Sequence, residues 1–374
     1  MKLGNLWRHL ALAVVAVFVV AACGSSNSSG SASCSESTAK TATSVTACGG
    51  MEGLIAAAKS EGRLNIIAVP RNWANYGAII DKFTATYGIP ITSDNPDGSS
   101  QNEVDAVKQL GTTSRAPDVL DIGKAVTLAN LTLYAPYEVS TWGDIPTAQK
   151  EATGLYVQDY GGYMSIGYDS AKLPAITSLD DLFKSEFKGK VALNGNPKQA
   201  NAALNGVMMA SLAEGGSADD ISKGVDFFHR LKQAGNFVPV QATDATVKNG
   251  TTPVVFDWDY LNAAHGADVP TWKVFEANNA LIGDYYNQAI NKNAPHPAAA
   301  RLWEEFLYSD TGQNLWLAGK ARPVRLAAMT QKGTVDQTAA ANLPTVTGTP
   351  VFLTDAQATA AKNYVVAHWD AAIS

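Results

Sequence analysis

The sequence predicts an α/β protein built from two units, and three observations support this fold class. The chain has 374 residues, which is room for about two domains at roughly 150 residues each. Hydrophobic residues make up 46% of it and charged residues 17%, so most of the chain is expected to fold. Helical and strand patterns alternate from residue 52 onwards, which favours crossover connections and a mostly parallel sheet.

The first unit is expected to begin with helices and strands in turn. Helices are predicted at 51–61, 76–87 and 101–111, and short apolar strands at 64–69, 89–92 and 119–122. Gly62 follows the first helix and Pro70 follows the first strand, where such residues commonly end these elements.

After residue 160 the pattern changes and the strands lie further apart. Strands are predicted at 163–168, 189–194 and 252–256, and for part of 280–290. Helices are predicted at 200–212, 225–234, 298–308 and 311–318. The sequence has no internal repeat and no heptad array, so we expect a second α/β unit.

The N-terminal segment has the order of a secretion signal. Lys2 and Arg8 precede an apolar run at 10–20, which is short for a bilayer span of about 20 residues, although a retained membrane anchor is the alternative. Val20-Ala21-Ala22-Cys23 resembles the bacterial lipobox. We therefore expect a lipoprotein signal peptide at 1–22, lipidation of Cys23, and anchoring to the outside of the cell membrane.

Residues 23–51 are rich in Ser, Gly, Thr and Ala and predict a flexible tether without a core. Cys34 and Cys48 lie in this segment, either as a disulfide or as two incidental thiols. No cysteine follows residue 50, so the folded body is not expected to depend on a disulfide.

Charge and motifs exclude several classes of function. The chain has 28 Lys and Arg against 34 Asp and Glu, a net charge of −6, so nucleic acid is a poor partner. The five histidines show no zinc-ligand spacing, and no nucleophile elbow, P-loop or G-x-G-x-x-G motif occurs. We expect no metal, no cofactor and no catalytic residue. The lack of a motif argues against an enzyme without excluding one, since catalytic groups can come from distant positions.

Three segments resemble bacterial extracellular solute-binding proteins, the receptors of ABC importers. They are Gly62–Ile91 with its N-W-A-N-Y segment, Arg115-Ala-Pro-Asp-Val-Leu-Asp-Ile-Gly123, and Ala298–Gln313 with its S-D-T-G-Q ending. The resemblance implies a two-lobed periplasmic-binding-protein fold, the type II Venus flytrap, with mixed sheets and two interlobe crossovers. It also implies a monomeric receptor that delivers a small molecule to a membrane permease.

The same resemblance predicts how the chain divides between the lobes. Lobe 1 is expected to hold residues 52–162 and 287–330, and lobe 2 residues 163–286 and 331–374. The crossovers are expected near 161–168 and 281–286.

Within this family the chain is most similar to the spermidine/putrescine-binding group. The resemblance implies a polyamine-like cation held by Trp73, Tyr76, Asp257, Trp258, Asp259 and Asp284, since aromatic faces and carboxylates both attract an ammonium group. Three alternatives remain: Trp73 packs the first helix, the acids near Trp258 cap a helix, and Asp284 serves a hinge.

One segment departs from the polyamine-binding pattern. Asn194, Asn196 and Lys198 stand after a strand where those receptors present acids, and they precede a helix N-terminus, which favours an anion. They are further candidate contacts in lobe 2 and leave open a zwitterion such as an aminoalkyl phosphonate. Tyr285-Tyr286 resembles the tyrosine pair of ferric-ion receptors, and an anchored enzyme on the same fold is the last alternative.

Overall fold

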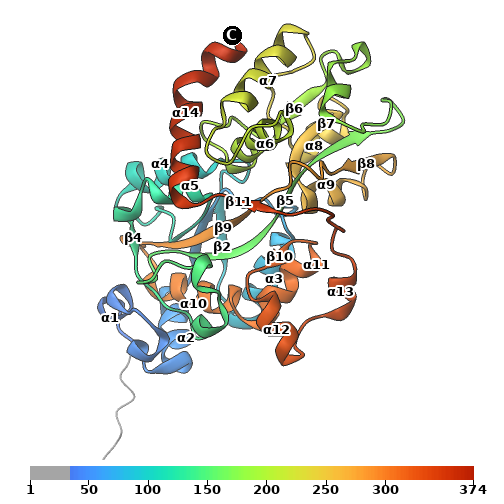
Figure 1. The fold of residues 1–374 in the computed structure, drawn as a ribbon. Helices are drawn as coiled ribbons and strands as arrows, with labels where there is room; N and C mark the ends of the chain where they lie inside the picture. The colour runs from blue at the N-terminus through green and yellow to red at the C-terminus, as the bar shows by residue number, and fades with distance from the viewer. Residues whose placement is uncertain (1–33) are drawn as a thin grey trace, which may run out of the picture. The chain divides into compact units, whose positions relative to one another are not determined.

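The structure is a computed structural model that describes residues 34–374. The predicted signal peptide at 1–22, the lipidation site Cys23 and the first part of the predicted tether lie outside the described residues. Figure 1 shows helices packed around strands that pass through the middle of the described body.

The predicted alternation of helices and strands in the first unit is confirmed. The elements are α2 (Gly50–Glu61), β1 (Leu64–Ile67), α3 (Tyr76–Tyr87), β2 (Ile91–Asp94), α4 (Ser100–Leu110), β3 (Val119–Ile122), α5 (Lys124–Leu128) and β4 (Tyr134–Ala135). Gly62 and Gly88 end α2 and α3 in the left-handed conformation, which a residue without a Cβ adopts at little cost. Strands β1 and β2 pair in parallel.

Two long antiparallel strands, β5 (Val157–Asp169) and β9 (Ile282–Asn291), organise the larger sheet. The first half of β5 pairs with β9, and its second half pairs with β7 (Val254–Trp258) and β8 (Trp272–Phe275). Strand β6 (Val191–Leu193) extends the sheet parallel to β7, and β3 pairs with the far end of β9.

The sheet is therefore mixed, as the flytrap fold requires, and not mostly parallel as the alternation alone suggested. The reason is that β5 and β9 run antiparallel through both halves of the body, so they carry the two crossovers. The architecture is a periplasmic-binding-protein fold.

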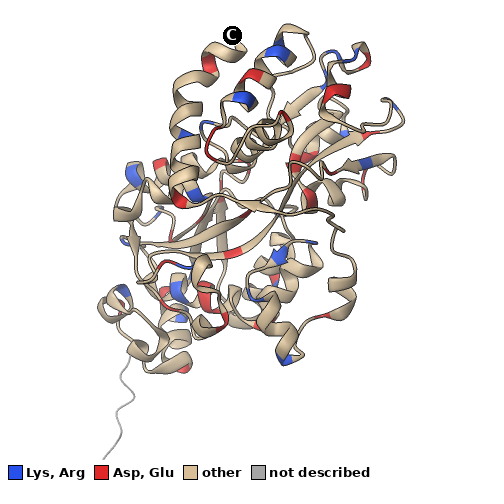
Figure 2. Ribbon diagram, viewed as in Figure 1, with Lys and Arg blue, Asp and Glu red and all other residues tan. Residues whose placement is uncertain are grey.

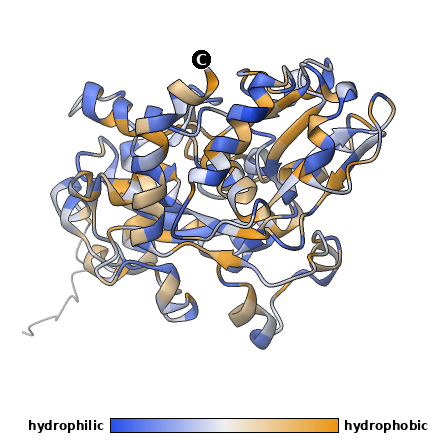
Figure 3. Ribbon diagram, turned by 45° about the horizontal axis from the view of Figure 1, so that its top comes forward, coloured by the Kyte–Doolittle hydropathy of each residue, from blue (hydrophilic) through white to orange (hydrophobic). Residues whose placement is uncertain are grey.

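The second half of the chain surrounds β6 and β7 with helices. These are α6 (Asn201–Ala213), α7 (Ser222–Gln233), α8 (Asp244–Lys248) and α9 (Asp259–His265). Helix α6 is buried over most of its length, whereas α7 buries only the side that carries Phe227, Phe228 and Leu231. In Figure 3 several helices alternate between orange and blue along their length, as expected when one face is buried.

The C-terminal part returns to both halves of the sheet. It contains α10 (Pro297–Leu307), α11 (Asp310–Ala318), β10 (Arg322–Pro323), α12 (Leu326–Lys332), α13 (Gln337–Ala341), β11 (Val351–Phe352) and α14 (Asp355–Ile373). Strand β10 pairs with β5 and β11 with β9. Helix α14, red in Figure 1, packs against α7 and was not predicted.

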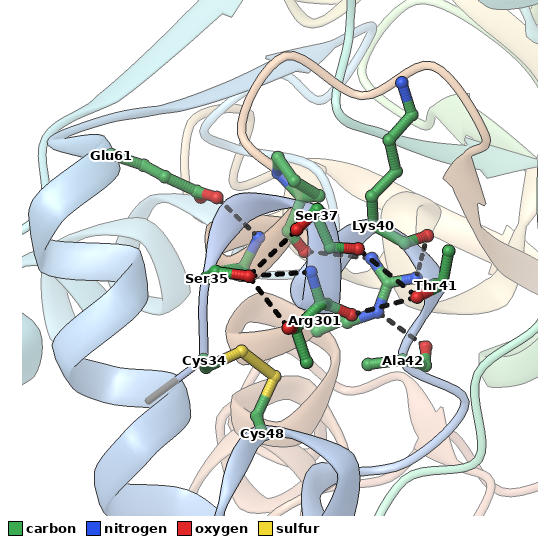
Figure 4. Close-up of a disulfide and its surroundings, with 12 residues drawn as sticks. Cys34, Ser35, Ser37, Lys40, Thr41, Ala42, Cys48, Glu61 and Arg301 are labelled. Carbon is green, nitrogen blue, oxygen red and sulfur yellow. Dashed lines mark hydrogen bonds between the residues drawn. A yellow bond between two sulfur atoms is a disulfide. The ribbon is translucent and has the colours of Figure 1, made fainter. Parts of the chain in front are cut away.

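The prediction of a flexible tether is wrong for residues 34–51. Helix α1 (Glu36–Thr41) and the 3₁₀ turn η1 (Val45–Cys48) fold back onto the body, and a disulfide joins Cys34 to Cys48 (Figure 4). Arg301 of α10 donates hydrogen bonds to the carbonyl oxygens of Lys40 and Ala42. Small buried side chains such as Ala39 provide the packing that the sequence analysis expected only from large aliphatic ones.

Short 3₁₀ turns complete the fold, namely η2 (Leu131–Leu133), η3 (Trp142–Asp144), η4 (Thr147–Gln149), η5 (Leu179–Phe183) and η6 (Ser185–Phe187). None of the helices in residues 34–374 is both long and apolar enough to span a bilayer.

Candidate functional site

A cavity of about 380 Å³ lies where the carboxyl ends of several strands meet. The loops after β1 and β2 and the end of β3 form one side. The loop after β6, the end of β7 and helix α9 form the other, and Tyr286 of β9 lies between them. Open α/β sheets bind ligands at this edge.

The loop after β1 holds Trp73 at the cavity in an unusual backbone conformation. Ala68, Ala74 and Asn75 all have positive φ, which side chains with a Cβ adopt only at a cost. The Asn75 amide donates to the Leu315 carbonyl oxygen at 2.8 Å, and Gly319 gives the loop room because a Cβ there would crowd Ala74 and Asn75. Contacts with α11 thus maintain the strained loop.

Trp73 and Tyr286 form an aromatic wall of the cavity. Their rings meet edge to face with centroids 5.7 Å apart, and the Trp73 indole N–H donates to the Tyr160 hydroxyl at 2.7 Å. Tyr160 in turn stacks on Tyr286. Tyr160 thus contacts both side chains and holds them in place.

The cavity lining is strongly acidic. Among the described residues that line it, six are acidic and none is Lys or Arg; the six are Asp97, Glu103, Asp121, Asp244, Asp257 and Asp268. Asp244 and Asp268 bind Lys248, which lies outside the lining. Elsewhere acidic and basic residues are interspersed along the helices, as Figure 2 shows.

Asp257 lies at the end of β7 and is 3% exposed. One carboxylate oxygen accepts from the Trp258 backbone N–H at 2.8 Å, and the other accepts from the Asn194 amide at 2.9 Å. Burial raises the pKa of Asp257 to about 7, although both hydrogen bonds oppose the rise. A cation in the cavity would favour its charged form.

Asp121 of β3 is a second buried carboxyl group at the cavity, and it was missed in the sequence analysis. Its Oδ2 accepts hydrogen bonds from the Tyr76 and Tyr160 hydroxyls at 2.8 and 2.9 Å. Its Oδ1 is buried and has no partner among the described residues. Burial raises the pKa of Asp121 to about 7. The signal in the sequence was an acidic residue inside the apolar run 119–122.

Four of the predicted contacts line the cavity: Trp73, Asp257, Asn194 and Asn196. Two more support the lining from behind. Tyr76 bonds Asp121, and Trp258 is buried with its indole N–H donating to the Tyr286 hydroxyl at 3.3 Å.

The structure places the remaining three predicted contacts elsewhere. Asp259 forms a buried ion pair with Arg322 at 2.6 Å. Asp284 is partly buried and accepts from the Asn201 and Asn205 amides. Lys198 pairs with Asp370 of α14 at 2.6 Å. Each of these three charged side chains is therefore bound to a partner that is distant in sequence.

The N-terminus of α6 also reaches the cavity. Ala200 occupies the N-cap without a side-chain hydrogen bond, and Asn201 and Ala202 line the cavity. The first backbone N–H groups of an α-helix lack intrahelical acceptors, so this end favours negative charge.

The tyrosine pair does not act as a unit. Tyr286 faces the cavity, whereas Tyr285 stacks against Phe352, as alternation along a strand requires. Among residues 34–374 no group of three or more His, Cys, Asp or Glu is arranged to hold a metal ion.

Comparisons with known proteins agree with this architecture. Residues 126–346, more than half of the chain, match a protein-family model described as bacterial extracellular solute-binding protein. No protein with a curated description matches the chain in sequence.

Solved structures with the same fold have low sequence identity to this chain. AgtB from A. tumefaciens R10, in complex with agropinic acid, superposes with a TM-score of 0.66 at 18% identity, covering 83% of this chain and 98% of its own. A periplasmic thiamin binding protein superposes with a TM-score of 0.64 at 17% sequence identity. The match covers 83% of this chain and 96% of that protein. A candidate spermidine/putrescine ABC transporter protein from Listeria monocytogenes superposes with a TM-score of 0.58 at 13% sequence identity. The match covers 83% of this chain and 99% of that protein.

Proposed function

The chain belongs to the bacterial extracellular solute-binding proteins, and we propose that it captures a small organic cation in the cavity and delivers it to an ABC permease. Membership of this family makes it an extracytoplasmic solute-binding receptor. The identity of the solute is the subject of the proposal.

The observation that carries the proposal is the acidic lining of the cavity, where Asp257 and Asp121 are buried carboxyl groups and none of the described lining residues is Lys or Arg. A cation that leaves water needs carboxylate partners, because an unpaired buried charge is costly. It also gains about 0.5–2 kcal/mol over an aromatic face. Asp257 supplies the first requirement, and Trp73 and Tyr286 supply the second.

The predicted contacts take separate roles in this proposal. Trp73, Asp257, Asn194 and Asn196 contact the ligand, and Tyr76 and Trp258 hold the neighbouring groups in place. Asp259, Asp284 and Lys198 stabilise the walls through their own partners.

A zwitterion is the second candidate, and the α6 N-terminus favours it. An aminoalkyl phosphonate or an amino acid would place its ammonium group near Asp257 and its acidic group at the free N–H groups near Asn201. A ferric ion receives less support, because Tyr285 points away from the cavity.

The proposed receptor closes around its ligand as two lobes. Residues 52–162 and 287–330 form lobe 1, and 163–286 and 331–374 form lobe 2, with β5 and β9 as the connections. Two-lobed proteins of this kind move by hinge closure. Lipidation of Cys23 would hold the monomeric receptor at the membrane beside its permease.

A thermal-shift panel tests the proposal. Putrescine, spermidine, 2-aminoethylphosphonate, amino acids and ferric citrate are compared, since a ligand at 100 times its Kd stabilises the native state by about 2.7 kcal/mol. We expect an amine-bearing compound to stabilise the protein most. Stabilisation by ferric citrate alone, or by anions without an amine, would contradict the proposal.

Calorimetry on Asp257→Asn then locates the site. Loss of this carboxylate is expected to weaken binding of the best amine by about tenfold or more, because the pair it forms is buried. Asp180→Asn is the matched control, since Asp180 is exposed and is not among the lining residues. Equal affinity of the two variants would place the ligand elsewhere.

A further inference from the structure

We infer that Oδ1 of Asp121 accepts an N–H of the bound ammonium group, so that the receptor selects amines bearing N–H groups over quaternary ammonium compounds. This inference rests on the proposed function and names the class of cation within it.

The two carboxylate oxygens of Asp121 differ in their hydrogen bonding. Two tyrosine hydroxyls donate to Oδ2, whereas Oδ1 is buried and has no partner among residues 34–374. The residue is 7% exposed and borders the cavity. A buried polar atom without a partner is costly, and a ligand donor would remove that cost.

Among the described residues, the neighbouring groups do not donate a hydrogen bond to Oδ1 of Asp121. Glu103 accepts from the Asp121 backbone N–H, and Asp159 is another carboxyl group. The Gln288 amide donates to the Tyr76 hydroxyl and to Asp159. The surroundings of Asp121 are therefore rich in acceptors, and no lining residue is Lys or Arg.

Oδ1 of Asp121 distinguishes amines that carry N–H groups from quaternary ammonium compounds. The faces of Trp73 and Tyr286 attract a methylated and an unmethylated ammonium group alike. Both oxygens of Asp257 already accept hydrogen bonds. An acceptor without any partner discriminates between the two ligand classes, because a quaternary nitrogen has no hydrogen to donate.

A water molecule is the alternative partner of Oδ1. A hollow of about 10 Å³, bordered by Asp121 together with Tyr76, Gln288 and Trp303, is the size of one water molecule. A water held there would satisfy Oδ1 without any ligand contact. The experiment must separate these two cases.

The experiment measures Kd by calorimetry for two pairs of probes: putrescine with its bis(trimethylammonium) analogue, and ethanolamine with choline. For the pair that binds, we expect wild type to prefer the N–H form by about tenfold or more. Asp121→Asn should reduce that preference to the part that Asp257 provides, by weakening the amine alone. Its amide oxygen can still accept from the two tyrosines, which leaves an NH₂ group in place of Oδ1.

Asp159→Asn is the matched control, because Asp159 is also buried and adjoins Asp121 but does not line the cavity. It should keep the preference. A purely structural effect would weaken both members of a pair and leave their ratio unchanged.

Each outcome decides the matter. If wild type binds the quaternary member as well as the amine, the inference fails while the proposed cation receptor stands. If wild type discriminates and Asp121→Asn discriminates by the same factor, Oδ1 serves the hollow and the inference also fails. If no member of either pair binds, the inference fails together with the proposed function for these cations. Should Asp121→Asn not fold, Asp121→Ser replaces it in this comparison, and a wild type without preference still overturns the inference.

Discussion

Burial acts in the same direction on the two carboxyl groups at the cavity and raises the pKa of both Asp257 and Asp121 to about 7. In the free protein each group is therefore partly protonated near neutral pH. Glu103 and Asp159 beside them have pKa values raised well above normal, so they add little negative charge. The free site thus avoids the repulsion that several buried carboxylates would create.

This arrangement predicts that cation binding releases protons. The bound cation favours the charged carboxylates, so affinity should rise from about pH 6 to about pH 8, by up to about tenfold per pH unit for each group that must ionise. Calorimetry in two buffers of different ionisation enthalpy gives the number of protons released. Asp257→Asn should release fewer than wild type, and an affinity independent of pH would contradict the assignment.

Sequence reasoning identified the chemistry of some residues but not their partners. The family resemblance named Trp73 and Asp257, and both line the cavity. Lys198 and Asp259 were equally good candidates by sequence. Their pairing with Asp370 and Arg322 depends on segments 172 and 63 residues away, which only the folded chain brings close.

At the scale of elements, helices with clear ends were predicted and helices of small residues were not. Helix α2 ends at Gly62 and α3 at Gly88. Helix α14 instead buries Ala358, Ala361, Val365 and Trp369 along one side, with mostly polar and small residues between them. Two alanines give too weak an apolar stripe for the pattern to be recognised in the sequence.

Residues 34–48 also lack a strong apolar pattern in the sequence. A disulfide and hydrogen bonds from Arg301 hold this segment on the body (Figure 4). We predict that reduction lowers the free energy of unfolding by about 3 kcal/mol, the value for closing a loop of roughly 15 residues. Denaturant unfolding with and without reductant measures it.

The Cys34→Ser/Cys48→Ser double variant is the control for this measurement. It should unfold like the reduced wild type and should not respond to reductant. Ligand affinity should stay unchanged in both, because neither cysteine lines the cavity. Equal unfolding free energies of oxidised and reduced wild type would show that the segment is held by its other contacts.

At the scale of the whole described body, the two sides of the cavity approach each other closely. The Gln101 backbone N–H donates to the Gln199 carbonyl oxygen, and the Gln241 amide donates to the Asp97 carbonyl oxygen, each at 3.3 Å. Gly123, at the start of α5, lies against Asn201 at the start of α6, and a Cβ built on Gly123 would overlap that side chain. In the proposed division these contacts join lobe 1 to lobe 2.

We therefore predict that Gly123→Ala hinders closure. Its backbone angles, φ −69° and ψ 151°, suit alanine, so the fold should persist. The added methyl group should disfavour the closed state and weaken ligand affinity by about the factor by which the closed population falls. Calorimetry and small-angle scattering with saturating ligand measure both effects, and Gly143→Ala, with open space around it, is the control. Wild-type affinity and compaction in Gly123→Ala would mean that this contact persists in the open receptor and lies on the hinge.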